Sequence, residues 1–424
     1  MRIAITALAL TMLAAPAAWA VDVPEQPTFN RDVLPILQEN CQECHRPKAI
    51  NISGMVAPFA LISYDEARPW AKSIAKAVES RKMPPWFATE EFHGVFRNER
   101  GLTTDEIETV VRWAATGASR GLEQDAPPPL EFNDSEWWLG EPDLVVSLPE
   151  PVWVGDEIYD WQPNIDIVLT EDMLPEDRYL RAVECQPGSE GVHHIVIAAM
   201  PPGGDDGSLA AAAGGKGIGG LAPGSEPSMA LEGYGILLEK GSTLRVNMHY
   251  FKEPGEGTGF YDQSTIGLHF YPKDAEVTEI DGDPLGTLDF EIPPGQPEWQ
   301  VAHARTFERD FSVLSYLPHM HLRGVAAQYV AVLPDGTQET ILDVPKYDYN
   351  WQVRYQYPEP RPFPAGTRIE VTWTFDNSEL NKSNPDPSKA IDFGLETIDE
   401  MAFGFINYVW DDAPGAEATA GGGS

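Results

Sequence analysis

The sequence is poor in cysteine. Its 424 residues include only three cysteines, and two of them, Cys41 and Cys44, stand in one tight motif. A disulfide framework therefore cannot stabilise the fold. Stability has to come from buried apolar cores, and a content of 42% hydrophobic side chains is enough to build several. A chain of this length is expected to form two or three domains.

Positive charge is scarce as well. The 29 Lys and Arg residues stand against 66 Asp and Glu, which gives a net charge of −37. Such a charge repels phosphate backbones and anionic lipid surfaces, so nucleic acid is not expected as a partner. The negative charge can steer a cationic redox partner toward the protein. It is equally typical of a solvated acidic surface without a partner.

Long hydrophobic runs are absent beyond the first twenty residues, so no transmembrane segment is expected. Residues 1–20 carry one positive charge at Arg2, an apolar run from Ile3 to Leu13 and the small-residue exit Ala18-Trp19-Ala20. These features predict a cleaved signal peptide, and the short apolar run with Pro16 near its end argues against a membrane anchor. The mature protein is expected in the periplasm, outside the thiol-reducing cytoplasm.

The mature chain divides into two parts that differ in the spacing of their apolar residues. Helical spacing of apolar residues predicts helices over 31–39, 64–80 and 104–115, and the Pro-rich stretch 126–129 follows them. Beyond it, short alternating apolar runs such as 243–251 and 368–375, separated by turn residues, predict antiparallel β-sandwiches. The expected domains are a signal peptide (1–20), a helical domain (21–125), a linker (126–139), two β-sandwiches (140–284 and 285–412) and a flexible tail (413–424).

The stretch Cys41-Gln-Glu-Cys44-His45 is a C-x-x-C-H motif. In this motif both thiols form thioethers to a porphyrin and the histidine ligates the haem iron, which predicts one covalent haem c. A disulfide or a zinc half-site is the alternative, but no second Cys/His pair stands nearby to complete a zinc site.

Met83 is the candidate for the sixth iron ligand, since it follows a predicted helix and precedes two stiffening prolines. Met55 and His93 remain alternatives. Residues 28–120 resemble class I cytochromes c, and the resemblance implies a small all-α haem domain.

After His45, five of the other eight histidines fall in three short motifs: His193-His194, Met248-His249-Tyr250 and His319-Met320-His321. Residues two apart on a strand face the same way, so His319 and His321 can present two imidazoles to one metal ion. Adjacent histidines diverge on a regular strand, and both can bind one ion only at a strand end or a bulge, which Gly191 upstream permits.

These motifs, followed by Asp399-Glu400-Met401, stand in an order similar to that of the copper type II, ascorbate-dependent monooxygenases, to which dopamine beta-monooxygenase and peptidylglycine alpha-hydroxylating monooxygenase belong. The resemblance covers residues 140–412. It implies two tandem jelly-roll domains, each holding one copper ion across a solvent-filled cleft.

The resemblance also implies roles for the ligands. The first, electron-supplying copper would be bound by His193, His194 and His249. The second copper, where O2 is activated and catalysis takes place, would be bound by His319, His321 and Met401. The chemistry agrees, because imidazoles tolerate Cu(I) and Cu(II) whereas a thioether favours Cu(I).

Four further residues are expected to be structural. The histidines His93, His269 and His303 have no companions at ligand spacing. Cys185 is interpreted as a buried small hydrophobe, with a thiolate copper ligand as the alternative.

Two departures from the family narrow the function. Where peptide-amidating members hold a substrate carboxylate with an arginine and polar residues, this chain has Leu317, Phe403 and Phe405. A carboxylate would face apolar rings there, so a small apolar substrate is expected instead. The fused haem supplies a tethered electron source, which makes ascorbate unnecessary.

Together these features predict an exported monooxygenase that hydroxylates a C–H bond with O2. Electrons would come from an external donor, either a quinol-linked or soluble redox protein or an ascorbate-like reductant, and pass through the haem to the first and then the second copper. The alternatives are a non-catalytic electron-transfer or copper-handling protein, and a cell-envelope binding module in which only the haem is redox-active.

Metal analysis of the purified protein separates these alternatives. Both the monooxygenase and the electron-transfer protein are expected to contain one iron and two coppers per chain, because the ligand sets are the same. One iron without copper would identify the binding module and refute the copper assignment.

Overall fold

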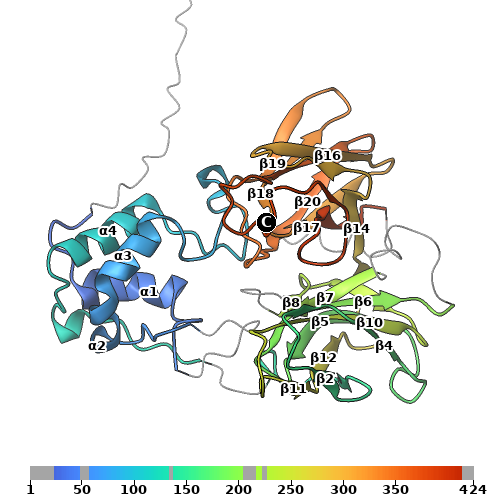
Figure 1. The fold of residues 1–424 in the computed structure, drawn as a ribbon, viewed down its shortest axis with the longest axis horizontal. Helices are drawn as coiled ribbons and strands as arrows, with labels where there is room; N and C mark the ends of the chain where they lie inside the picture. The colour runs from blue at the N-terminus through green and yellow to red at the C-terminus, as the bar shows by residue number, and fades with distance from the viewer. Residues whose placement is uncertain (1–22, 48–56, 133–136, 204–215, 222–226, 413–424) are drawn as a thin grey trace, which may run out of the picture.

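The computed structural model describes residues 23–47, 57–132, 137–203, 216–221 and 227–412 (Figure 1). The predicted signal peptide, the tail and Met55 lie outside these residues. Within the described ranges, no helix combines the length and the apolar character needed to cross a membrane.

The helical part, at the left of Figure 1, consists of short elements. The α-helices are α1 (Leu34–Asn40), α2 (Tyr64–Ala67), α3 (Ala71–Glu79) and α4 (Thr104–Ala115), with a π-helical turn at Phe29–Val33 and 3-10 turns at Arg68–Trp70, Glu90–Phe92 and Glu123–Asp125. The helix predicted over 104–115 is confirmed, and it begins with a capping box between Thr103 and Glu106. The helix predicted over 64–80 is interrupted by the 3-10 turn that contains Pro69, because proline lacks the amide proton that a continuous helix uses.

The β part follows in two groups of strands. The first group is β1 (Leu144–Ser147), β2 (Val152–Val154), β3 (Asp160–Trp161), β4 (Asn164–Val168), β5 (Arg178–Gln186), β6 (Val192–Met200), β7 (Lys216–Leu221), β8 (Ser228–Met229), β9 (Tyr234–Leu238), β10 (Thr243–Phe251), β11 (Phe260–Asp262), β12 (Thr265–Phe270) and β13 (Thr278–Glu279). One sheet has the order β1-β12-β5-β9-β13 with β8 on β5, another has the order β3-β10-β6-β7 with β4 on β10, and β2 pairs with β11.

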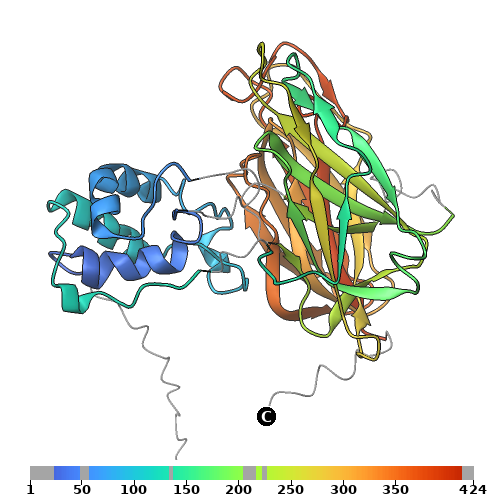
Figure 2. The same cartoon turned by 90° about the horizontal axis from the view of Figure 1, so that it is seen from below.

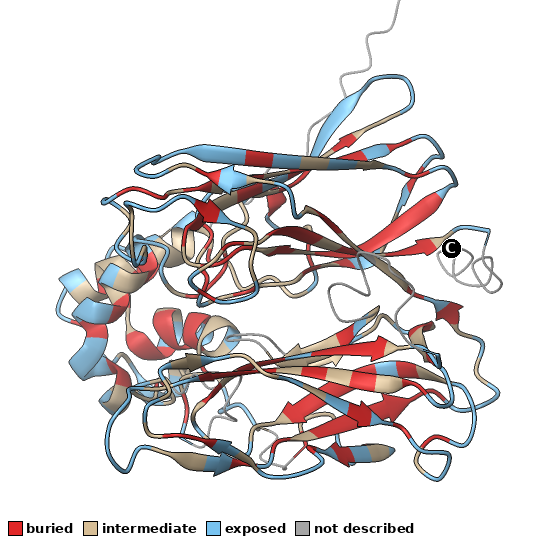
Figure 3. Ribbon diagram, turned by 45° about the vertical axis from the view of Figure 1, so that its right-hand side comes forward, coloured by how far each residue is buried: buried red, intermediate tan, exposed pale blue. Residues whose placement is uncertain are grey.

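The second group is β14 (Asp281–Thr287), β15 (Glu291–Ile292), β16 (Trp299–Thr306), β17 (Phe311–His319), β18 (Gly324–Val332), β19 (Gln338–Val344), β20 (Tyr355–Phe363), β21 (Arg368–Phe375), β22 (Ile391–Asp392) and β23 (Ala402–Trp410). Its main sheets have the orders β14-β23-β17-β20 and β16-β21-β18-β19. Each group encloses its own apolar core, and Figure 3 shows buried residues alternating with exposed ones along many of the strands.

The segment between α3 and α4 packs on the second group of strands instead of on the helices. Trp86, Phe92 and Phe96 belong to the core of that group. The Trp86 ring lies 4.9 Å from the ring of Tyr355, centroid to centroid. The Thr89 amide also donates to the carbonyl of Asp343 over 3.0 Å. The helical part is therefore joined to the β part by a buried contact as well as by the chain, and both lie side by side in Figure 2.

The predicted fold class, an all-α cytochrome c domain followed by two jelly-roll domains, is wrong. The described chain is mostly β, its four main sheets hold most of the core, and its α-helices span only 4 to 12 residues. No self-contained all-α domain stands among the described residues 23–125, because residues 86–96 give their apolar side chains to the C-terminal core. Only the tertiary structure shows in which core these side chains are buried.

Candidate metal sites

The first histidine cluster lies where β6 and β10 run side by side. His249 on β10 stands directly opposite His194 on β6, and the next pair is Tyr250 with Val192, so His193 is the extra residue of a β-bulge. The bulge turns the side chains of His193 and His194 toward one point, which is one of the two arrangements that the adjacent histidines need in order to bind one ion. Gly191 is needed beside it, because a Cβ atom at that position would lie 2.2 Å from the Phe260 ring.

The three imidazoles converge through the same ring atom. The Nδ1 atom of His194 lies 3.5 Å from Nδ1 of His193 and 3.2 Å from Nδ1 of His249. The potential ligand atoms of the three residues all lie within 4.8 Å of one another. A single metal ion can bridge such a set, since each nitrogen supplies one lone pair.

A carboxylate orients one of these rings. Nε2 of His249 donates to Oδ1 of Asp160 over 2.9 Å, which leaves Nδ1 as the unprotonated atom that faces the cluster. Metal-binding histidines commonly donate their second N–H to a carboxylate in this way. The role of Asp160 could not be predicted from the sequence, because this residue lies 89 residues from His249, on the two-residue strand β3.

Burial keeps two of the imidazoles neutral. Burial, with the neighbouring His249, lowers the pKa of His193 to about 4, and it lowers the pKa of His194, which is 7% exposed, well below its usual range. Neutral imidazole is the form that binds metal ions, so these two rings can bind an ion without first releasing protons at neutral pH.

The second cluster lies at the end of β17. Nε2 of His319 is 3.2 Å from the sulfur of Met401, and the His319 and His321 rings stand at 89° with centroids 5.3 Å apart. The strand ends at His319, so His321 lies in the following turn and not on the strand as expected. The structure nevertheless brings the three predicted residues together, since β17 pairs with β23 just after Met401.

Hydrogen bonds aim both rings of the second cluster. Nδ1 of His319 donates to Oε1 of Gln352 over 2.7 Å, and Nδ1 of His321 donates to the carbonyl of Asp399 over 3.2 Å. Both Nε2 atoms therefore carry free lone pairs. Burial also lowers the pKa of His321 to about 3, so this ring is neutral as well.

A buried carboxylate shapes the turn that carries His321. Glu400 accepts hydrogen bonds from the backbone amides of His321 and Arg323 over 2.8 and 2.6 Å. Arg323 is buried too, and it donates to Asn377 over 3.1 Å. Because Glu400 directly precedes Met401, the same residue connects the histidine turn to the thioether. From the sequence alone, Glu400 is part of the Asp399-Glu400-Met401 motif without an assigned role.

A tyrosine ring lies between the two clusters. Tyr349, from the β19–β20 loop, is stacked on His193 at 6.2 Å between centroids and 13° between planes. Its other neighbour is His321, 5.9 Å away at 80°. Tyr349 is only 9% exposed, so here a buried side chain stands where the resemblance implied a solvent-filled cleft.

The C-x-x-C-H motif forms a tight turn after α1. The amides of Cys44 and His45 both point to the carbonyl of Cys41, at 3.3 and 2.9 Å. Nδ1 of His45 donates to the carbonyl of Phe59 over 3.0 Å, which leaves Nε2 for an iron ion. Neither cysteine forms a disulfide bond, so the residues present fit a covalently attached haem.

The candidates for the sixth iron ligand stand in different surroundings. Met83 is half-buried and precedes the buried Pro84, and it stays the predicted ligand. His93 is exposed and its ring is hydrogen-bonded to Glu99 over 2.7 Å, which supports the structural role expected for it.

The other residues predicted to be structural lie apart from the two clusters. His269 on β12 and Cys185 on β5 are buried in the neighbouring sheet, and burial raises the pKa of the Cys185 thiol. His303 lies half-buried on β16.

Comparison with known proteins adds little. No family model matches the chain, and no curated protein matches it. Solved structures with partial similarity include the VP2 subviral particle of infectious bursal disease virus, with 11% identity over 65% of this chain and 74% of that one and a TM-score of 0.21. Paenibacillus xanthan lyase matches at 10% identity over 63% of this chain and 25% of that one, with a TM-score of 0.17. Similarity at this level supports no statement about function.

We expect the metal-free protein to lose stability as the pH falls from about 6.5 to about 4. In this window the unfolded chain binds a proton at His193 that the folded protein excludes, because the pKa is lowered to about 4 on folding. Chemical unfolding at about pH 7 and about pH 5 measures the loss. His193→Gln should show a smaller difference, and an undiminished difference in this variant would contradict the explanation.

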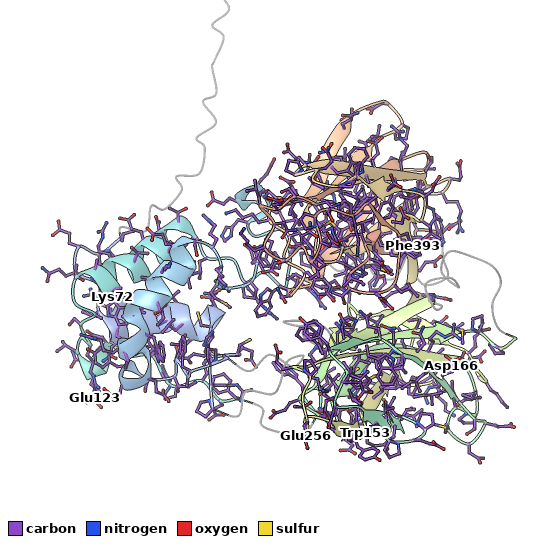
Figure 4. All side chains as sticks on the ribbon, in the orientation of Figure 1. Lys72, Glu123, Trp153, Asp166, Glu256 and Phe393 are labelled. Carbon is purple, nitrogen blue, oxygen red and sulfur yellow. The ribbon has the colours of Figure 1, made fainter. Side chains whose placement is uncertain are left out.

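Asp160→Asn is expected to weaken copper binding at the first cluster by roughly 10- to 100-fold, because His249 loses its charged partner. Asp166→Asn is the matched control, since Asp166 also lies near β10 but is paired with Arg245 at the surface (Figure 4). Titration against a chelator gives both affinities. Equal losses in the two variants would exclude a specific role for Asp160.

Proposed function

We propose that the protein is an exported, copper-dependent monooxygenase that carries one covalent haem c and hydroxylates a C–H bond of a small apolar molecule with O2. The observation that supports this proposal is the pair of unlike ligand sets, three converging imidazole Nδ1 atoms beside a His/His/Met set. The sets differ in softness, as expected when one metal ion passes electrons and the other meets dioxygen.

The first set suits an ion that cycles between oxidation states. His193, His194 and His249 offer three imidazole nitrogens, which tolerate both Cu(I) and Cu(II). Asp160 holds the ring of His249 in place, so little rearrangement has to accompany a change in charge.

The second set suits Cu(I). The thioether of Met401 is a soft ligand, and Gln352 and Asp399 hold the two imidazoles with their Nε2 atoms free. A copper ion bound there would supply the one-electron chemistry that activates O2. The chain itself orients the ligands and keeps them neutral.

The surroundings of the second set favour an apolar substrate. The ring of Phe405 lies 6.2 Å from the His319 ring and 5.9 Å from Phe403, and Phe405 is only half-buried. These rings offer no charge-assisted partner to a carboxylate. An apolar molecule held against Phe405 would lie close to His319 without burying an unpaired charge.

The haem would receive electrons from an external donor, a quinol-linked or soluble redox protein or an ascorbate-like reductant. Cys41, Cys44 and His45 would hold the haem, with Met83 as the predicted sixth ligand. The packing of Trp86 on Tyr355 joins the segment after Met83 to the sheet that carries His319, which supports delivery within one molecule.

A non-catalytic electron-transfer or copper-handling protein is the second candidate. It is favoured by the burial of the ligands, since His321 is only 4% exposed and leaves little open surface for a substrate. This candidate predicts electron flow that does not depend on an organic molecule.

The decisive experiment supplies copper-loaded protein with a reductant, O2 and a panel of hydrophobic small molecules. We expect substrate-dependent O2 consumption and a product that carries one oxygen atom from labelled O2, as detected by mass spectrometry. Glycine-extended peptides should not react, because the site lacks a partner for their carboxylate. Steady reductant oxidation without any oxygenated product would establish the second candidate instead.

Met401→Leu provides the matched control for this experiment. The change keeps the size and apolar character of the side chain but removes the sulfur, so we expect loss of product of roughly tenfold or more and retention of copper at the first cluster. Unchanged product formation in this variant would refute the assignment of Met401.

A further inference from the structure

The ring of Tyr349 contacts both histidine clusters. It is stacked on His193 of the first cluster and meets His321 of the second cluster edge to face, with centroid distances of 6.2 and 5.9 Å. The side chain of Tyr349 is 9% exposed, so the ring is buried against both sets of ligands. A short chain of packed rings thus runs from one cluster to the other.

The hydroxyl of Tyr349 is anchored to the supports of both clusters. It lies 3.2 Å from the hydroxyl of Thr397, which also accepts a hydrogen bond from Nε2 of Gln162 over 2.9 Å. Gln162 directly follows β3, the strand that carries Asp160. Thr397 belongs to the loop from Phe393 (Figure 4) to Glu400, which leads into Met401.

The loop that carries Tyr349 is held at two more points. The Tyr347 hydroxyl donates to the carbonyl of Met320 over 2.8 Å, and Gln352 accepts from His319 over 2.7 Å. Both contacts are made to the His319-Met320-His321 turn. The ring of Tyr349 is therefore fixed from either side of its own loop as well as through its hydroxyl.

From this geometry we propose that Tyr349 is a positioning residue whose ring provides the path for electrons between the two metal sites. The inference rests on the proposed function, since it requires copper at both clusters. With copper at both clusters, one electron would pass from a Cu(I) held by His193, His194 and His249 to a Cu(II) held by His319, His321 and Met401, so that the first would become Cu(II) and the second Cu(I). No bond is made or broken, Tyr349 ends unchanged, and the electron originally comes from an added reductant such as ascorbate.

The ring matters because it lies between His193 and His321 and packs against both. Removal of the ring from Tyr349 would leave a gap between His193 and His321 and let both imidazoles shift. A misplacement of about 1 Å can change a rate on the order of a hundredfold.

The test measures redistribution of one electron and does not involve turnover. Two-copper protein whose haem is already reduced and whose coppers are oxidised is mixed, without substrate, with ascorbate that supplies one electron per protein, and freeze-quenched samples are followed by electron paramagnetic resonance. The three-imidazole Cu(II) and the His/His/Met Cu(II) give different signals because their ligands differ. We expect an exchange between the two signals whose rate is independent of protein concentration.

The variants separate the ring from the hydroxyl. Tyr349→Leu should slow the redistribution by roughly 10- to 100-fold, whereas Tyr349→Phe, which keeps the ring, should stay within about threefold of the unmodified protein. Thr397→Val removes the anchor of the hydroxyl together with the hydrogen bond from Gln162, so it loosens the surroundings of the ring more than Tyr349→Phe does and should give an intermediate rate. Should Tyr349→Leu fail to fold, the Thr397→Val rate decides, and a rate equal to that of the unmodified protein then overturns the inference.

The outcomes distinguish this inference from the function on which it rests. Tyr349→Leu protein that holds both coppers and redistributes the electron at the normal rate overturns the role of Tyr349 and leaves the proposed function standing. Tyr349→Phe that is as slow as Tyr349→Leu also overturns it, because the ring alone would not suffice. Absence of copper from either cluster in the unmodified protein overturns both proposals.

Discussion

The burial of the two histidine clusters is the constraint on which the rest of the structure depends, with His194, His249 and His321 buried and His193 and His319 half-buried. A buried imidazole is held neutral by the cost of desolvating its charged form, and this cost dominates the lowered pKa values of His193 and His321. A neutral ring has one N–H and one lone pair, so the partner of the N–H decides where the lone pair points. Asp160, Gln352 and the Asp399 carbonyl make that choice here.

These partners also explain why the two clusters are built from such different parts of the chain. The strands β6, β10 and β17 bring in histidines at fixed register, which is the rigid component. The loops after β19 and before β23 bring in the groups that orient the rings. A site of this kind needs both components, since a ligand on a rigid strand can still rotate about its side-chain bonds.

The strands and the ligand motifs could be predicted from the sequence to a large extent. The run predicted over 243–251 is β10, and the run predicted over 368–375 is β21, because alternation of apolar residues is a local property of each segment. The need for a bulge at His193-His194 followed from the period of two in a strand, and the bulge is present.

What could not be predicted lies in contacts between distant segments. Asp160, Tyr349 and Gln352 stand in short strands or irregular loops without any periodic pattern, so no local rule singles them out. The fold class failed for a related reason: the apolar side chains of Trp86 and Phe96 read as part of a helical domain, yet they are buried against Tyr355. Proximity in sequence did not determine which core they joined.

The bulge at His193 has a consequence for how this protein can vary. In an antiparallel ladder, the loss of one residue from a strand transfers every following side chain to the opposite surface. Deletion of His193 would instead make the pairing of β6 with β10 regular. The pairs Tyr250–Val192 and His249–His194 would then follow each other without an extra residue. A regular β6–β10 ladder would thus be obtained together with the loss of a ligand. Selection for folding alone would remove this irregularity, so its persistence in a lineage would serve as a marker that the metal is still in use.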